Sequence, residues 1–245
     1  MGRKIIKAYH VISVTEAEFH NLFYNTNEED HRRLFSRLRE ILDSGYLLPG
    51  KTFKGSRTLI WDKYAGDDKY VFLSLGKRYI EQYGEYAYGF VFDARQLIIE
   101  LNAVLGIEDL AWDYHKLAME AFEQVFLTIS RGSIVPFKTS GWMHAGVKEM
   151  PLEKQYLYHA IYAGRTELPG VKEFQQVFRQ LTKHVQATKR FSGTQALNVM
   201  EQWENLAKKP TRDPEILVPD KLPIPYALSL IQRGKEIPLS QKRVE

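Results

Sequence analysis

One carboxylate stands out near the end of the 245-residue sequence, in the segment RDPEILVPDKLPIPYALSLI. Glu215 opens a short apolar run, Ile216 to Val218, and prolines follow at positions 219, 223 and 225. A carboxylate at the start of a buried strand is either solvated at the strand end or used for chemistry, because burying an unpaired charge is costly. The prolines stiffen the backbone that follows. Glu215 is therefore the first candidate for a group held in place to stabilise positive charge or to accept a proton.

Other residues that could take part in chemistry lie in the first third of the chain. His10 stands beside Tyr9 in an apolar segment, and Ser74 ends the run VFLS two residues before a glycine. Tyr79 and Tyr83 are four residues apart, so both can lie on one side of a helix. Each residue also has a purely structural interpretation: a strand histidine bonded to the backbone, a serine at a strand end, and tyrosines in the core.

The candidate set also includes one cationic residue, and three residues could take this role. The segment GKTFKGSRT offers Lys51, Lys54 and Arg57 as equals. Arg57 is taken together with the residues above, and the combination of His10, Arg57, Ser74, Tyr79 and Glu215 is more informative than any single member.

Several kinds of site are absent from the sequence. The chain has no cysteine, which excludes disulfides, thiolate nucleophiles and cysteine-ligated metals. It contains no G-x-G-x-x-G, Walker A, H-E-x-x-H or G-x-S-x-G motif. The seven histidines show no metal-ligand spacing, so we expect no metal. No apolar run is long enough to span a membrane, and we expect a cytoplasmic protein.

The charge of the chain permits a nucleic-acid partner without requiring one. The formal net charge is +4 and the isoelectric point is about 9.0. Two amphipathic segments near residues 171–209 are expected to be helices and carry many cations. They could form a face that follows a phosphate backbone, or simply a solvated helix face. The cations concerned are Lys172, Arg179, Lys183, Lys189 and Arg190.

The expected elements place strands at the two ends of the chain and helices between them. Strands are expected at 4–12, 56–64, 69–76, 88–98 and 214–219, and further strand and loop at 133–147. Helices are expected near 15–23, 27–45, 107–130, 171–191 and 193–209, with a short closing helix at 225–234 and a frayed tail. This segregation predicts an α+β fold rather than alternating βαβ units.

Five segments together resemble the ADP-ribosyltransferase superfamily. They are YHVIS, LREILDSGYLLPG, KYVFLSLG, YGFVFDARQLI and PEILVPDKLPIPYAL. The pattern is most similar to the DNA-targeting ADP-ribosyltransferase toxins of bacterial toxin–antitoxin systems and their relatives, over residues 5–100 and 212–231. The resemblance implies a single domain, 1–245, with a split β-sheet around a central cleft that binds NAD as substrate. Residues 101–210 match nothing in that pattern and are expected to form a helical insertion.

The resemblance also implies a role for each candidate residue. His10 would contact the nicotinamide ribose or carboxamide, and Ser74 would position the dinucleotide. Tyr79, or alternatively Tyr83, would stack on the nicotinamide ring. Glu215 would hold the ribose 2′-hydroxyl and stabilise the oxocarbenium-like transition state, and it could deprotonate the acceptor. Arg57 would bind the pyrophosphate or a phosphate of the acceptor.

Departures from the family pattern narrow the expected acceptor. Asp213 and Pro214 precede Glu215, so the E-x-E or Q-x-E pair of the arginine-modifying branch is missing. Modification of a protein arginine is therefore less expected. The acceptor could be DNA, RNA or protein, and we favour nucleic acid slightly. The biological role stays open between a toxin with an antitoxin partner, a phage-defence factor and an effector delivered into a host cell.

Two other functions remain as alternatives. The chain could be a non-catalytic binding module for protein or nucleic acid, including a pseudoenzyme that keeps the fold. It could also be similar to RNA 2′-phosphotransferases, which share the fold and use NAD as acceptor. The strand PEILV, with its leading glutamate, argues against the second alternative.

Overall fold

The structure is a computed structural model that describes residues 5–12, 41–49, 58–84, 87–108, 110–130, 152–206 and 214–239. The chain divides into two compact units. A sheet unit comprises residues 1–54, 69–109 and 189–245, and a helical unit comprises residues 55–68 and 110–188. The α+β class expected from the sequence is confirmed. The helical unit has different bounds from the expected insertion at 101–210, and it also takes in the segment 55–68.

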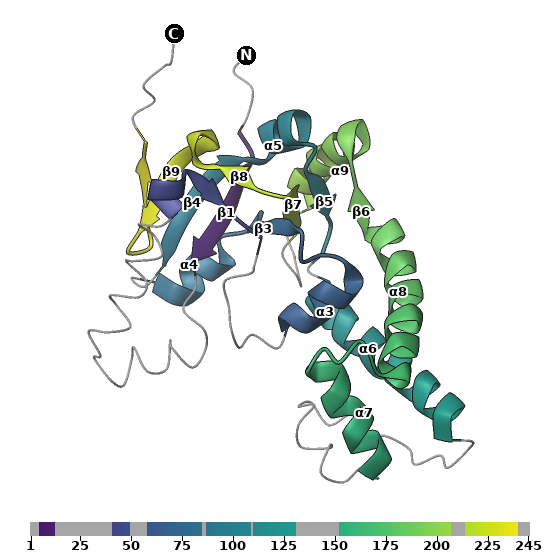
Figure 1. The fold of residues 1–245 in the computed structure, drawn as a ribbon. Coiled ribbons are helices and arrows are strands. Elements are labelled where there is room, and N and C mark those ends of the chain that lie inside the picture. Colours follow the sequence, from purple (N-terminus) through teal and green to yellow (C-terminus); the bar gives the residue numbers. More distant parts are fainter. Residues whose placement is uncertain are drawn as a thin grey trace. The chain divides into compact units, whose positions relative to one another are not determined.

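The sheet unit is built on one antiparallel sheet, shown in Figure 1. Its order in the described part of the chain is β10-β9-β4-β1-β3-β7-β5-β6, and each pairing is antiparallel. The strands are β1 (Lys7–Ile12), β3 (Tyr70–Ser74), β4 (Tyr88–Asp93), β5 (Val104–Gly106), β6 (Arg190–Phe191), β7 (Glu215–Pro219), β9 (Ala227–Gln232) and β10 (Lys235–Pro238). A separate small sheet pairs β2 (Tyr46–Leu47) with β8 (Leu222–Pro223).

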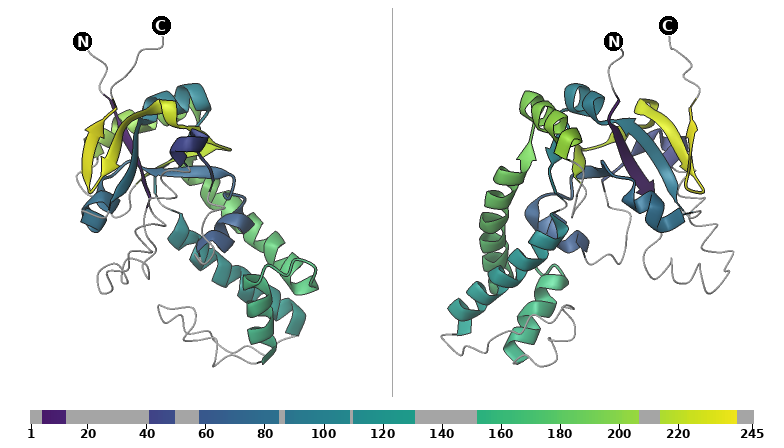
Figure 2. Two further views of the ribbon diagram at one scale, coloured as in Figure 1. Left: turned by 60° about the vertical axis from the view of Figure 1, so that its left-hand side comes forward. Right: turned by 180° about the vertical axis from the view of Figure 1, so that it is seen from behind.

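Both faces of this sheet are packed, which accounts for the nearly continuous burial along β4. On the core face, strand residues pack with α5 (Ala94–Leu101) and α9 (Gly193–Leu206). Figures 1 and 2 show both helices beside the strands of this unit. On the opposite face, which we call the tyrosine face, a smaller cluster packs with α4 (Arg78–Tyr83). This cluster comprises Tyr9, Ala87, Val91 and Ile231, with Val11, Ile80 and Tyr83 against them.

The helical unit has an aromatic core. It contains α3 (Thr58–Ala65), α6 (Ala111–Ser130), α7 (Leu152–Tyr162) and α8 (Pro169–Lys189, whose last residue is assigned to the sheet unit). The ring centroids of Trp61 lie 5.9 Å from those of Phe174 and of Phe178. A buried polar group joins the helices: the Tyr114 hydroxyl donates to Asp67, and Gln186 Nε2 donates to the same carboxylate over 3.3 Å. Packing and buried hydrogen bonds thus hold this unit together internally.

Two sequence predictions of secondary structure are wrong. The expected strand at 56–64 is the helix α3, because Trp61 and Tyr64, three residues apart, both enter the helical core. The expected closing helix at 225–234 is strand β9, which buries alternate residues, preceded by a single 3₁₀ turn at Ile224–Tyr226. The tail expected to fray contributes β10. The expected segments at 15–23 and 133–147, and most of that at 27–45, lie outside the described residues.

Other predictions are confirmed with shifted ends. The strands expected at 4–12, 69–76 and 214–219 are β1, β3 and β7, and three of the expected helices are α6, α8 and α9. The strand expected at 88–98 stops at Asp93, whose side chain accepts a hydrogen bond from Arg95 N over 3.0 Å and caps α5. An N-cap aspartate of this kind ends the strand by starting the helix.

A close approach of two strands requires glycine at one position. A Cβ added to Gly89 in β4 would lie 1.9 Å from the backbone oxygen of His10 in β1, and its φ is 154°. No L side chain fits there unless the central pairing of β1 with β4 shifts.

We therefore predict that Gly89→Ala destabilises the sheet unit by more than about 3 kcal/mol. Gly45→Ala is the matched control, because Gly45 has φ 72° but nothing within 4 Å of an added Cβ. This control should cost only the backbone strain, about 1–2 kcal/mol. Urea denaturation of both variants measures the difference, and equal losses of stability would contradict the role given to the close approach.

Candidate functional site

Glu215 is held at the start of a strand that has a neighbour on each side. Its register partners are Ser74 on β3 and Gly106 on β5. Just before it, the Pro214 carbonyl accepts a hydrogen bond of 2.9 Å from Leu75 N. The three residues that follow Glu215 are buried. A slip of one residue would reverse the face of every side chain in this strand, so the flanking strands hold the position of Glu215 firmly.

The pairing continues from Glu215 across the sheet as one row. Ser74 pairs with Tyr9 on β1, Tyr9 with Val91 on β4, and Val91 with Ser229 on β9. Directly opposed residues of antiparallel strands share a face, with Cβ atoms about 4.5–5.5 Å apart. Glu215, Ser74, Tyr9, Val91 and Ser229 therefore form what we call the cross-strand row, and it lies on the tyrosine face.

His10 does not belong to this row. Successive strand residues point to opposite faces, so His10 lies on the core face, where its register partner is Phe90. Its Nδ1 is 3.0 Å from the carbonyl oxygen of Phe72. A carbonyl only accepts, so Nδ1 carries the hydrogen. A hydrogen bond from His10 to the backbone is what we expect if this residue has a purely structural role.

The hydrogen bond of His10 lies where β1 and β3 separate. Among the described residues the two strands share the single register pair Tyr9–Ser74, at one end of β3. The imidazole then reaches across to Phe72, two residues further along β3. His10 thus extends the link between the two halves of the sheet beyond the last backbone pair.

Ser74 has a local structural role as well as its place in the row. Its hydroxyl accepts a hydrogen bond of 3.1 Å from Gly76 N and lies 3.2 Å from Gly76 O. This geometry closes the turn that follows β3, as serine hydroxyls commonly do. The side chain is 7% exposed, so it reaches little solvent.

The remaining predicted residues are only partly described. Tyr83 packs against the cluster on the tyrosine face, so it lies on the same side of the sheet as the cross-strand row. Tyr79 lies one turn earlier in α4, but its side chain is outside the described residues. Arg57, with its competitors Lys51 and Lys54, is also outside them. The structure therefore brings Glu215, Ser74 and Tyr83 to one face and leaves the expected cation untested.

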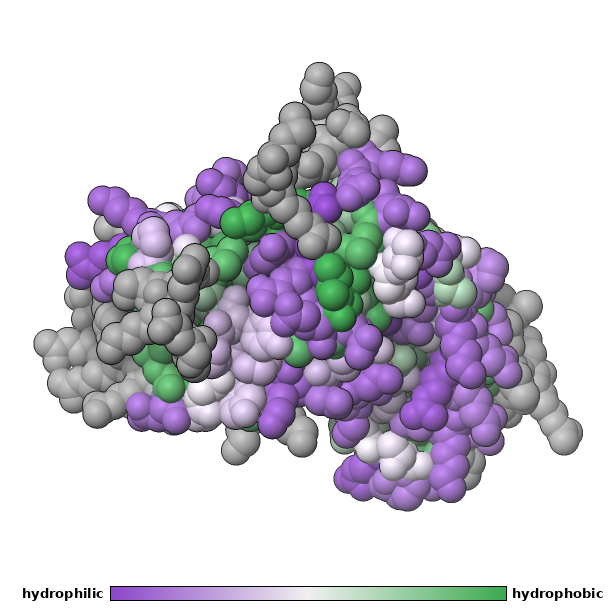
Figure 3. All heavy atoms as spheres, turned by 90° about the horizontal axis from the view of Figure 1, so that it is seen from above, coloured by the Kyte–Doolittle hydropathy of each residue, from purple (hydrophilic) through white to green (hydrophobic). Residues whose placement is uncertain are grey.

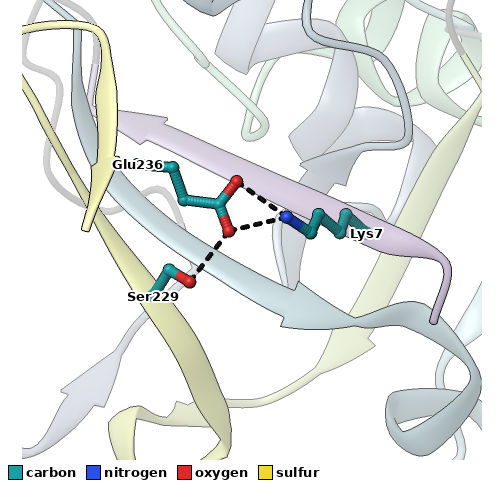
Figure 4. A network of polar contacts seen from close by, with 3 residues as sticks. All are labelled: Lys7, Ser229 and Glu236. Carbon is teal, nitrogen blue, oxygen red and sulfur yellow. Dashed lines mark hydrogen bonds and ion pairs between the residues drawn. The ribbon is translucent and has the colours of Figure 1, made fainter. Parts of the chain in front are cut away.

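Sequence analysis missed a polar cluster on the same face, drawn in Figure 4. Lys7 Nζ lies 2.8 Å from both carboxylate oxygens of Glu236, and the Ser229 hydroxyl donates to Oε1 over 2.8 Å. Lys7 comes from β1, Ser229 from β9 and Glu236 from β10. Because β10 lies in the tail that was expected to fray, no pattern in the sequence pointed to this cluster.

The cluster sets the charge state of its surroundings. Burial raises the pKa of Glu236, but hydrogen bonds from Lys7 and Ser229 and the charges of Lys7 and Lys77 outweigh it and hold this pKa below its usual range. Burial, helped by the Glu236 charge, raises the pKa of the Tyr9 hydroxyl. At neutral pH the tyrosine face therefore carries an ionised Glu236 beside a protonated Tyr9.

The tyrosine face brings together the carboxylate of Glu215, the hydroxyl of Ser74 and the ring of Tyr83. Within the residues that the structure describes, no group of three or more His, Cys, Asp or Glu side chains could hold a metal ion. No helix in that part of the chain is long and apolar enough to cross a bilayer. Seen from above in Figure 3, the described residues present mostly hydrophilic side chains, with smaller hydrophobic areas between them. Carboxylate and hydroxyl groups such as those of Glu215 and Ser74 form hydrogen bonds with sugars and other polyols.

We predict that His10→Leu destabilises the sheet unit by about 1–3 kcal/mol, because the Phe72 carbonyl loses a partly buried partner. His10→Asn is the conservative control, since its side-chain amide can replace the Nδ1 donor, and it should keep most of the stability. Thermal unfolding of both variants gives the comparison. Equal destabilisation by the two changes would show that the hydrogen bond is not what His10 contributes.

Comparison with known proteins adds no assignment: no family model, no curated protein and no solved structure matches the chain.

Proposed function

We propose that the chain is a mono-ADP-ribosyltransferase that moves ADP-ribose from NAD to a macromolecular acceptor, with nucleic acid favoured over protein. The observation that carries this proposal is the place of Glu215 on a strand with neighbours on both sides, in register with Ser74 and Tyr9. A carboxylate held this firmly is what transfer of a ribosyl cation requires. The likeness of the PEILV segment to the catalytic strand of the superfamily supports the same role.

In this proposal Glu215 acts on the nicotinamide ribose. Its carboxylate accepts a hydrogen bond from the ribose 2′-hydroxyl and stabilises the positive charge that develops on the sugar. The bond between ribose C1′ and the nicotinamide nitrogen breaks, and neutral nicotinamide leaves with the electron pair. An acceptor oxygen or nitrogen forms the new bond to C1′, and its proton passes to the Glu215 carboxylate or to water.

Other residues of the sheet unit would position the dinucleotide. Tyr83, or Tyr79 one turn earlier, offers an aromatic face on which the nicotinamide ring can stack. Ser74 fixes the turn after β3 through its contacts with Gly76, beside the strand that carries Glu215. His10 would act as a positioning residue, because its hydrogen bond links the two halves of the sheet.

The way the sheet is joined supports an ADP-ribosyltransferase-like split sheet. β10, β9, β4 and β1 form one half, and β3, β7, β5 and β6 the other. Among the residues that the structure describes, the register pair Tyr9–Ser74 and the hydrogen bond of His10 link the two halves. Two halves joined this narrowly can diverge, as a split sheet around a nucleotide requires.

We predict that Glu215→Gln lowers transfer of label from ³²P-NAD by at least ~100-fold, because the amide removes the charge that stabilises the transition state. The substrates are single-stranded DNA, duplex DNA, total RNA and lysate protein, each run separately. Glu81→Gln is the control: Glu81 is an exposed residue of α4 in the same unit, and its loss should leave labelling unchanged.

The same two proteins, studied with NAD, distinguish the proposed enzyme from a non-catalytic binding module. NAD that occupies a site stabilises the fold by mass action, so millimolar NAD should raise the melting temperature of wild type and of Glu215→Gln. Labelling that survives Glu215→Gln would refute the assignment of this residue. No labelling and no thermal shift in the wild type would favour a non-catalytic binding module.

A further inference from the structure

A stripe of cations runs along the exposed side of α8 in the helical unit. Val171, Phe174, Phe178 and Thr182 of this helix are buried in the unit. Lys172, Gln176, Arg179 and Lys183 are exposed. The buried and exposed sets repeat at helical spacing, so they occupy separate sides of one helix. The first set accounts for packing. With the described residues of the unit, the second set forms one hydrogen bond, through Arg179.

The three cations of this stripe are closely aligned. At about 100° per residue, Lys172, Arg179 and Lys183 fall within about 40° of one another around the helix axis. Along the axis, Arg179 lies about 10 Å from Lys172 and about 6 Å from Lys183. Consecutive phosphates of one strand of B-DNA rise about 3.4 Å along its axis, so these intervals correspond to about three and two phosphates.

The stripe is not neutralised by its own helix. No acidic residue occurs from Phe174 to Lys189, and Glu173 is turned about 100° away from Lys172. Lys172 and Lys183 form no ion pair with any residue that the structure describes. Arg179 donates from Nε to the carbonyl of Tyr64 over 3.3 Å, which fixes the base of its side chain on the unit.

The other two cations named from the sequence, Lys189 and Arg190, lie outside this stripe. Lys189 lies with the sheet unit and forms an ion pair with Glu108 at 2.8 Å. Arg190 lies in β6, with its guanidinium 5.9 Å from the centre of the Tyr70 ring. The phosphate-following face expected over five residues therefore reduces to Lys172, Arg179 and Lys183.

We propose that α8 binds the phosphate backbone of a nucleic acid along this stripe, without reading base sequence. Three aligned cations complement a repeating anion, and glutamine, which the stripe contains at Gln176, is a side-chain type that donates hydrogen bonds to phosphates in nucleic-acid complexes. The surface lies in the helical unit, outside the sheet unit that carries Glu215. The inference therefore does not depend on ADP-ribosyl transfer.

The test is the salt dependence of binding by the full chain. The probe is a fluorescein-labelled, mixed-sequence single-stranded DNA, with an RNA of the same sequence as a second probe, measured by anisotropy from ~50 to ~200 mM salt. The triple variant Lys172→Gln, Arg179→Gln, Lys183→Gln should bind about 100-fold more weakly at ~0.1 M salt. The slope of log K against log salt should fall by about 2 to 3, one step for each lost phosphate contact.

A charge-matched control distinguishes the effect of the stripe on nucleic-acid affinity from the effect of net charge. Lys116→Gln, Lys221→Gln, Lys235→Gln removes three exposed lysines outside α8 and lowers the net charge equally. The proposal predicts near wild-type affinity for this control. Equal weakening by both triple variants would overturn it, because binding would then follow net charge alone. Absence of wild-type binding at the lowest salt would overturn it too, as would competition by polyglutamate or phosphatidylserine vesicles equal to that by unlabelled DNA.

Discussion

The sheet unit depends on one constraint, the pairing of β7 with a strand on each side. Three consecutive residues of β7, Ile216 to Val218, are buried. Burial on both faces and pairing on both edges leave the strand a single register. The residue that precedes this run, Glu215, is therefore placed as firmly as the core itself. A surface loop could not hold a carboxylate with the same accuracy.

The same register determines which other side chains share the face of Glu215. Residues directly opposite each other on antiparallel strands lie on the same face of the sheet. The order of the strands therefore places one residue from each of five strands in a row from Glu215 to Ser229. Beside the far end of that row, Glu236 holds Lys7 and Ser229. The face thus has two carboxylates: Glu236, which is paired with Lys7, and Glu215, at the start of the strand whose burial fixes it.

Much of the fold could be predicted from the sequence, and the site only in part. The α+β class, several strands and the amphipathic helices follow from periodicity, which is local information. The sequence could not show which of the neighbouring residues Tyr9 and His10 shares a face with Glu215, because alternation shows only that the two lie on opposite faces. That choice depends on register between strands more than sixty residues apart. The Lys7–Glu236 contact spans almost the whole chain and left no local pattern.

The errors have the same physical origin. The segment at 58–65 has an apolar pattern short enough to suit either a strand or a helix, and its aromatic contacts in the helical unit decide for the helix. At 227–232, pairing with β4 decides for the strand. In both cases tertiary packing outweighs a weak local preference.

Hydrogen–deuterium exchange with and without NAD tests most directly whether the face that carries Glu215 is where the dinucleotide binds. The account predicts slower amide exchange in peptides covering residues 70–84 and 214–219, on β3, α4 and β7, while α6 and α8 are unchanged. Protection confined to the helical unit, or none at NAD concentrations that stabilise the protein, would contradict it.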